Sequence, residues 1–304
     1  MDFQLDNVIE VLLSSDNQRR MEAEKFVENI PTTHFDQGID AFLLTMNHEN
    51  IQVASMAALL LKKKYLEPED IAKNLTNEKL EHIVHGVQGC MNAERQPQFL
   101  KRCCDILVKV YNQIGQQKEL IGLIQSLSNE EHHNMKLALY YLIEISCECS
   151  FDDELHLQHA ASLDAIFQKG LSDESNQVKV AAFKTLTIFL SSIGEEKVVK
   201  KFESVLQLLI TKAIELIKFD QESGVTAVES INELIETHPK FVKPVLPQLL
   251  TIFTEIMEAK GLLINLRTTS MFGVLTLCMN HAASVRKNDY FKSNMIPAYM
   301  RMLS

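Results

Sequence analysis

Apolar residues recur at helical spacing through nearly all of the 304-residue sequence, and this periodicity constrains the fold more than any other feature. One clear stretch runs from Val178 to Ile193, and others begin at Leu206 and Leu246. Strand-like alternation is almost absent. Only 10 Gly and 7 Pro interrupt the pattern, whereas Leu, Ala, Lys and Glu, which favour helices, are abundant. The chain is therefore predicted to be helical throughout.

The polar breaks between the predicted helices are of two alternating kinds, which indicates paired helices. The second helix of each pair is expected to open near Asp16, Asn50, Gln96, Glu131, Asn176, Gln221 and Asn265. The resulting spacings are 34, 46, 35, 45, 45 and 44 residues. Most fall in the range of about 40–47 residues used by HEAT and armadillo repeats. Tetratricopeptide repeats are stricter, at about 34 residues with Trp signatures, and this sequence has no Trp.

The fold class predicted from these spacings is an all-α, HEAT-repeat superhelical solenoid of the armadillo-like kind. It has seven helical hairpins, expected at 2–30, 32–66, 76–114, 116–149, 154–194, 196–238 and 240–285, and part of an eighth at 288–304. The fifth hairpin is the clearest, because Asp173 is placed to cap a helix in which Val178, Ala181 and Ala182 permit close packing. One hairpin buries too little apolar surface to fold alone, so neighbours must stack.

Composition excludes several classes of function. The net charge is −10, from 40 acidic and 30 basic residues, which disfavours direct nucleic-acid binding and suits partners with basic segments. No apolar run approaches the roughly 18–20 residues that are needed to span a bilayer. The six cysteines fall inside helical patterns, which favours buried, reduced thiols of an intracellular protein.

No motif in the sequence indicates catalysis, a cofactor or a metal, so the chain is predicted not to be an enzyme. Phosphate-binding glycine loops and the nucleophile elbow are absent. Three lysines close one predicted helix, and solvated side chains are the favoured interpretation, with a localisation signal or a phosphate contact as the alternative. One acid–histidine cluster is also interpreted as solvated side chains, with a metal site as the alternative. These residues are Lys62, Lys63 and Lys64, and Asp152, Asp153, His156 and His159.

Two stretches near the start resemble the importin-β superfamily of nuclear transport receptors. LLSSDNQRRMEAEKFVENIP, from Leu12 to Pro31, is similar to its opening repeat, and Ala57 to Lys64 is similar to its second unit. ETHPKFVKPVLPQLL and NMIPAYMRML resemble the importin-five (karyopherin beta-three) branch. The resemblance covers all 304 residues, although from about 68 to 170 it is one of pattern only. By this resemblance, 1–304 is expected to be the N-terminal arch of a longer receptor.

The resemblance implies Ran-GTP-regulated protein import, with Ran-GTP on the N-terminal arch, basic cargo carrying nuclear localisation signals, and Phe-Gly (FG) nucleoporins between outward-facing helices. Such receptors shuttle between cytoplasm and nucleus through the pore. Because second helices line the concave side in this family, Glu22, Gln52, Met56 and Arg102 are candidate Ran contacts, with ordinary solvation as the alternative.

Candidate nucleoporin contacts are Phe202 and Leu206, which core packing explains equally well. The alternative function is a HEAT scaffold of another kind, such as a phosphatase regulatory subunit or a coat adaptor. Such scaffolds have more uniform repeats and lack a short second unit that ends in three lysines. Cargo identity, and import as opposed to export, stay open at this point.

Overall fold

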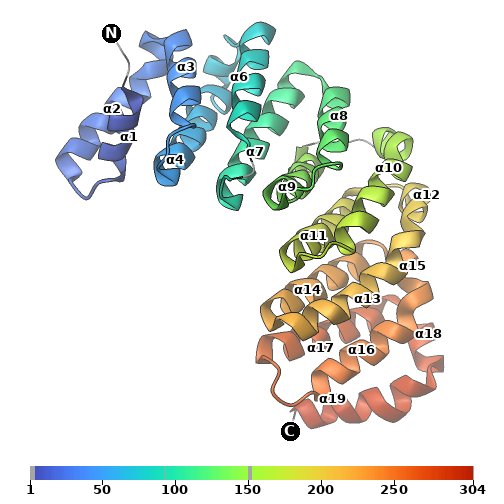
Figure 1. Cartoon of the computed structure of the whole chain (residues 1–304). Helices are drawn as coiled ribbons and strands as arrows, with labels where there is room; N and C mark the ends of the chain where they lie inside the picture. The colour runs from blue at the N-terminus through green and yellow to red at the C-terminus, as the bar shows by residue number, and fades with distance from the viewer. Residues whose placement is uncertain (1–3, 93, 150–152, 304) are drawn as a thin grey trace. The chain divides into compact units, whose positions relative to one another are not determined.

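A computed structural model describes residues 4–92, 94–149 and 153–303, and every regular element within those ranges is a helix (Figure 1). The helices form two compact units, unit 1 (Met1–Cys149) and unit 2 (Ser150–Ser304). Each unit is a stack of helix pairs. The predicted all-α, HEAT-type solenoid is therefore confirmed.

Unit 1 contains four helix pairs. They are α1 (Leu5–Leu13) with α2 (Asn17–Thr33), α3 (Phe35–Thr45) with α4 (Ile51–Leu61), α6 (Asn77–Cys90) with α7 (Pro97–Ile114), and α8 (Gln117–Leu127) with α9 (His133–Cys149). A π-helical turn, η1 (Lys62–Leu66), extends α4, and the short α5 (Glu69–Ala72) leads to the third pair. In this unit α4, α7 and α9 contact one another in succession as second helices, and α1, α3 and α6 do so as first helices.

Unit 2 contains three helix pairs and a further set of helices. The pairs are α10 (Asp153–Leu171) with α11 (Asn176–Ser192), α13 (Glu203–Phe219) with α14 (Gln221–Thr237), and α16 (Leu246–Glu258) with α17 (Ile264–Asn280). Short helices precede α13 and α16, and they are α12 (Glu196–Val199), η2 (Lys200–Phe202), α15 (Pro239–Val242) and η3 (Lys243–Val245). After α17 come α18 (Ala282–Lys287), η4 (Phe291–Met295) and α19 (Ile296–Leu303). Figure 1 shows α11, α14 and α17 along one side of this unit and α13 and α16 along the other.

The second helices begin at 17, 51, 97, 133, 176, 221 and 264, within two residues of the predicted positions. Polar side chains cap several of them. The Asp16 carboxylate accepts hydrogen bonds from two backbone N–H groups of α2, and Asn50 accepts one from α4. The cap of α11 differs from the prediction, because the N-cap residue is Ser175, whose hydroxyl accepts from the Val178 N–H. Asp173 accepts from the N–H of Ser175 at 2.8 Å, and Ser175 is the residue just before the first residue of α11.

The cores of both units are apolar and rich in aromatic side chains. In unit 1 Tyr65 is fully buried, packs edge-on against Phe42, and donates its hydroxyl to the Phe35 carbonyl oxygen at 3.0 Å. Cys103 and Cys104 are also fully buried, and burial raises the pKa of both thiols. Cys90 is buried as well. Cys147 and Cys278 are only half-buried, so the prediction of buried thiols holds less well for these two.

Candidate functional site

The second helices of unit 1 carry the four residues that the sequence predicts to contact Ran. Glu22, Met56 and Arg102 are each the sixth residue of their helix, because α2, α4 and α7 begin at 17, 51 and 97. They therefore occupy the same repeat position in three successive helix pairs. Glu22 is exposed, whereas Met56 and Arg102 are half-buried. Gln52 is exposed and lies about one turn before Met56 on α4.

Arg102 also ties α7 to α4. Its Nη1 donates to the Ser55 carbonyl oxygen at 3.1 Å. Arg95 and Gln113 make the same kind of bond, at 3.1 and 3.2 Å, and each accepting carbonyl lies 47 residues earlier in the chain. This constant separation fixes the two segments in one parallel register. Because a guanidinium has five N–H donors, Arg102 keeps donors for a partner while it ties the helices together.

The three consecutive lysines do not form the solvated helix end that the sequence predicts. The chain continues from α4 into η1, so that Lys62 Nζ lies 2.6 Å from Asp105 Oδ2 and Lys64 Nζ lies 3.9 Å from Glu28 Oε1. Burial lowers the pKa of Lys62, but the hydrogen bond and the charge of Asp105 outweigh burial and raise this pKa above its ordinary value. Neighbouring helices thus take up two of the three cations, and Lys63 stays exposed.

Lys63 and Lys109 form a pair of cations that sequence reasoning did not group. Counted from the starts of α4 and α7, each is the thirteenth residue, so they occupy one repeat position. Neither makes an ion pair with any residue that the structure describes. By contrast, Lys101 on α7 is committed to the buried Glu144 on α9, at 3.1 Å. Met56 and Arg102 thus share one repeat position of the second helices of unit 1, and Lys63 and Lys109 share another, seven residues further along.

Phe202 and Leu206, the predicted nucleoporin contacts, lie in the core of unit 2. Phe202 is fully buried and packs edge-on against Phe189 with 5.1 Å between ring centroids, and the Phe167 centroid lies 5.4 Å from that of Phe189. Leu206 is 4% exposed. Core packing, the alternative left open by the sequence, accounts for both side chains. They hold α13 in place and present no surface to a partner in this conformation.

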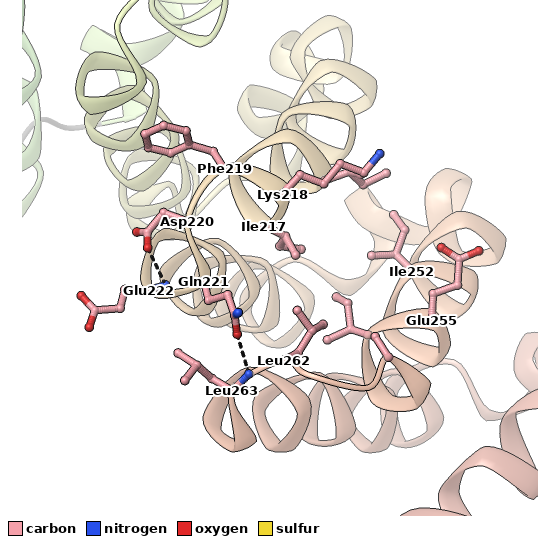
Figure 2. A pocket seen from close by; sticks show the side chains of 13 residues that line it. Ile217, Lys218, Phe219, Asp220, Gln221, Glu222, Ile252, Glu255, Leu262 and Leu263 are labelled. Carbon is pink, nitrogen blue, oxygen red and sulfur yellow. Dashed lines mark hydrogen bonds between the residues drawn. The ribbon is translucent and has the colours of Figure 1, made fainter.

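A large open pocket lies at the other end of α13, between the first helices α13 and α16 of unit 2 (Figure 2). Its volume is about 780 Å³. Figure 2 shows apolar side chains from both helices and from the turn before α17 pointing toward the cavity, among them Ile217, Ile252 and Leu262. The Gln221 side chain closes one end, since its Oε1 accepts from the Leu263 N–H at 2.6 Å.

The chemistry of this pocket suits an apolar side chain carried by a flexible polar segment. Its floor is formed by isoleucine and leucine, and Phe219, at 62% exposed, stands at the rim. Charged groups of both signs, Lys218, Glu222 and Glu255, surround the opening. Burying one aromatic ring on such a floor stabilises a complex by roughly 1.5–3 kcal/mol. The sequence did not reveal this pocket, because its lining residues come from three segments that also read as ordinary helix faces.

A second groove lies between first helices of unit 1. Its volume is about 660 Å³, and it runs between the start of α1 and the end of α3. Leu5 is buried at its base, and Leu44 is 74% exposed beside it. Asp6 and Asp40 also line this groove, and it has no lysine or arginine in its lining, unlike the pocket of unit 2. Both hollows lie between consecutive first helices.

Neither unit shows a metal centre or a membrane segment in its described part. No group of three or more His, Cys, Asp or Glu side chains there is arranged to hold a metal ion. Of the acid–histidine cluster considered in the sequence, Asp152 and the side chains of Asp153 and His156 lie outside the described residues. No described helix is long and apolar enough to cross a membrane.

The fold and its second-helix surface define a helical-repeat binding protein, and comparison with known proteins gives the family. The family model described as "IPO5-like, TPR repeats" matches residues 95–252, more than half of the chain. The chain belongs to this family, within the importin-β group of nuclear transport receptors. The family description speaks of TPR repeats. The second helices of this chain nevertheless recur at 34, 46, 36, 43, 45 and 43 residues, which are mostly HEAT lengths.

Individual relatives agree with the family assignment. Importin subunit beta-3 of Saccharomyces cerevisiae is 22% identical over 315 residues, which cover 98% of this chain and 28% of that protein. The crystal structure of Kap121p bound to Nup53p matches with a TM-score of 0.80 at 18% identity, over 98% of this chain and 29% of that one. Kap121p bound to RanGTP matches with a TM-score of 0.79 at 18% identity, over 97% of this chain and 28% of that one. The chain thus spans less than a third of the length of these relatives, and it shares their fold.

Proposed function

We propose that this chain acts in Ran-GTP-regulated protein import and binds Ran-GTP through the second-helix face of unit 1. The observation that carries the proposal is the family match, combined with one repeat position that presents Glu22, Met56 and Arg102 on successive helices. Kap121p, whose fold the chain shares, has been crystallised with RanGTP. Gln52 on α4, Lys63 on its extension η1, and Lys109 on α7 extend the proposed contact.

The direct test is binding of the 304-residue protein to Ran loaded with a GTP analogue or with GDP, measured by biolayer interferometry. We expect binding of the GTP form only. Met56→Asp places a charge in the centre of the proposed contact and is expected to weaken binding at least about tenfold, which corresponds to 1.4 kcal/mol. Met300→Asp, on the exposed face of α19, is the matched control. Equal binding of both nucleotide forms would refute the proposal.

The pocket between α13 and α16 is proposed to take the phenylalanine of an FG nucleoporin. Support comes from its apolar floor, its open rim and its place between first helices. Kap121p has been crystallised with Nup53p. This proposal moves the nucleoporin contact from Phe202 and Leu206, at the start of α13, to the surface at the end of that helix, and it assigns those two residues to the core. It also places the receptor at the pore while it passes between cytoplasm and nucleus.

An FG-repeat peptide and its Ser-Gly counterpart separate aromatic insertion from backbone contact. We expect the FG peptide to bind and the Ser-Gly peptide not to bind in a fluorescence anisotropy titration. Ile252→Asp, on the pocket floor, is expected to abolish the binding, whereas Leu157→Asp, exposed on α10, is expected to leave it unchanged. Binding that survives Ile252→Asp would show that the pocket is not the site.

Basic cargo with a nuclear localisation signal is the third proposed partner, and its release is proposed to be coupled to Ran. The physical basis is that small shifts at each helix-pair interface add along a solenoid, so binding at one face alters the curvature seen by another. In the full-length receptor, Ran-GTP is expected to lower cargo affinity. Unchanged cargo affinity in the presence of saturating Ran-GTP would exclude this coupling.

A further inference from the structure

Cations recur at one repeat position along an edge of unit 2. The short helices α12, α15 and α18 each lead from a second helix toward the next first helix, and Figure 1 shows them in succession along that edge. Lys200, Lys243 and Arg286 lie at the C-terminal ends of these helices, with 43 residues between one cation and the next. Lys201 and Lys287 directly follow the first and the third of them. These five residues form the basic row.

The residue directly before each repeated cation fixes the direction of the row. It is a valine in all three helices, and Val199, Val242 and Val285 are each only 1% exposed. All five cations of the basic row are exposed. The same step along the chain therefore places an apolar side chain in the core and a cation on the surface, once in each repeat.

Contacts between the three segments place the cations on successive levels of one edge. Lys240 Nζ lies 2.8 Å from Glu196 Oε1, which joins the first segment to the second. The His281 side chain is hydrogen-bonded to the Pro239 backbone and lies near the charge of Lys243, which joins the third segment to the second. Neighbouring packed helices are about 8–10 Å apart, so the three levels of the basic row span about 20 Å.

The basic row makes no ion pair within the part of unit 2 that the structure describes. The flanking Glu195 and Glu196 pair with other lysines, at 2.6 and 2.8 Å. Segments 195–203, 238–244 and 281–287 together contain seven Lys or Arg residues against three Glu, whereas the whole chain has a net charge of −10. This edge is therefore a cationic patch on an acidic protein, and it attracts an anionic partner.

Nucleic acids and membranes fit the basic row less well than an acidic protein does. Phe202 and Phe241 are buried, so these segments offer no aromatic platform on which bases of a single strand could stack. A DNA duplex carries a charge about every 1.7 Å, which is far denser than one level of cations about every 8–10 Å. The three segments expose no large apolar side chain that could enter a lipid surface.

We infer that the basic row binds an extended acidic protein segment with a carboxylate at about every third residue. Segments rich in like charges repel themselves and extend. In the polyproline II conformation every third side chain faces the same way, at intervals of about 9 Å. This interval matches the spacing of the levels, and about seven residues reach all three of them. The inference goes beyond the proposed function, in which neither Ran, cargo nor a nucleoporin is assigned to this edge.

The test is a fluorescence anisotropy titration of the 304-residue protein with a labelled peptide of four Glu-Pro-Ser repeats. The same peptide with Gln in place of Glu, and a peptide of the same composition with its four glutamates adjacent, serve as comparisons. At 50 mM salt we expect the Glu-Pro-Ser peptide to bind at least about tenfold more tightly than either. Its binding is expected to weaken at 300 mM salt, because the cations are exposed.

Three outcomes would overturn the inference. Equal binding of the glutamine peptide would exclude charge contacts, and equal or tighter binding of the peptide with adjacent glutamates would exclude the match in spacing. A DNA duplex and vesicles containing phosphatidylserine are titrated under the same conditions. Preference for either of them over the acidic peptide would exclude a protein segment as the partner.

Paired variants locate the site. Lys200→Glu with Lys243→Glu reverses the charge on two levels and is expected to weaken peptide binding about tenfold or more. Lys169→Glu with Lys260→Glu changes the net charge by the same amount, at exposed positions near the end of α10 and after α16, and is expected to have no effect. Equal losses in both pairs would overturn the assignment to the basic row.

A milder variant covers the case in which two reversed charges disturb folding. Arg286→Gln removes the cation of the third level only, and we expect it to weaken peptide binding about threefold while the urea unfolding midpoint stays unchanged. Unchanged peptide binding in this variant would overturn the contact at the third level. Because Ran-GTP and FG-peptide binding are measured on the same samples, failure of the acidic peptide with those two intact overturns this inference alone.

Discussion

The second helices are joined by ties from charged side chains in unit 1, whereas neutral hydrogen bonds and close backbone packing join them in unit 2, where Asn232 Nδ2 donates to the Thr269 carbonyl oxygen at 3.0 Å. In unit 1 the side chain of Arg102 bridges from α7 to a carbonyl of α4, and the ion pair of Lys62 with Asp105 joins the same two segments. In unit 2 a Cβ at Gly273 would lie 2.3 Å from Asn232 Oδ1 and 2.6 Å from the Phe253 ring. The unit 1 interface thus depends on charged side chains that cross between helices, and the unit 2 interface on a neutral amide and on the absence of a side chain at Gly273.

This difference leaves the two second-helix surfaces with different exposed groups. The ties of unit 1 use donors on α7 and leave a mixed face with Met56 and free cations. In unit 2 the helices pack closely through small residues and little charge is consumed, so the glutamates of α14 remain available. The same repeat architecture can therefore present chemically distinct faces, because the residues that join the helices determine which charges are left exposed.

The largest expected effect comes from the aromatic core on which the packing of unit 2 depends. Phe189→Ala removes a fully buried ring that contacts Phe167 and Phe202. We expect a loss of about 4 kcal/mol in the free energy of unfolding, measured by urea denaturation. Phe272→Ala, at a position 56% exposed on α17, is the control and should change stability little. Similar losses in both variants would contradict the core assignment.

The close packing itself is tested by Gly273→Ala. The new methyl group has no room beside Asn232 and Phe253, and we expect a loss of about 1–3 kcal/mol. Gly89→Ala provides the matched control, because nothing lies within 4 Å of a Cβ there in α6. That substitution is expected to stabilise unit 1 by about 0.5–1 kcal/mol, since alanine favours a helix over glycine. A fall in the free energy of unfolding for Gly273→Ala together with a rise for Gly89→Ala would support close packing as the feature that distinguishes unit 2.

The polar ties of unit 1 are tested by Arg102→Met. This change keeps most of the aliphatic stem and removes the hydrogen bond to the Ser55 carbonyl, so an expected loss of about 1–2 kcal/mol reports the tie. Arg102→Lys is expected to recover part of it. The free energy of unfolding is measured in urea at low and at high salt. Salt screens exposed charges more than half-buried ones, so a loss that persists at high salt reports the hydrogen bond and not surface charge. No change for Arg102→Met would mean that the polar ties do not stabilise unit 1.

The smallest expected effect is a pH dependence confined to unit 2. His281 is buried at the end of α17, and this burial lowers the pKa of the imidazole, although a hydrogen bond to the Pro239 backbone acts in the opposite direction. The unfolded chain takes up the proton first as pH falls below about 6.5, so unit 2 loses stability from there toward the lower pKa of the folded state. His281→Gln is expected to reduce the change in the unfolding midpoint of unit 2 between pH 7 and pH 5. His132→Gln, in an exposed turn, is expected to leave the profile unchanged.

Several features of the protein follow from the sequence alone. Helical periodicity with alternating breaks gave the all-α repeat fold and the second-helix starts, because caps such as Asp16 and Asn50 act on the next few residues of the same segment. The four Ran candidates could be placed on second helices, although their contact with Ran stays a prediction. Resemblance at Leu12–Pro31 pointed to the importin-β superfamily, to which the chain belongs.

Only the tertiary structure decided which residues of a helix face a neighbour and which face solvent. Phe202 and Ile252 both follow helical apolar patterns, yet one fills the core and the other lines an open pocket. Lys62 and Lys63 are adjacent in sequence, and only the position of Asp105 on the next helix pair separates a paired cation from a free one. Periodicity within a segment fixes local structure, whereas the side chains that end up exposed depend on contacts about 40 residues apart.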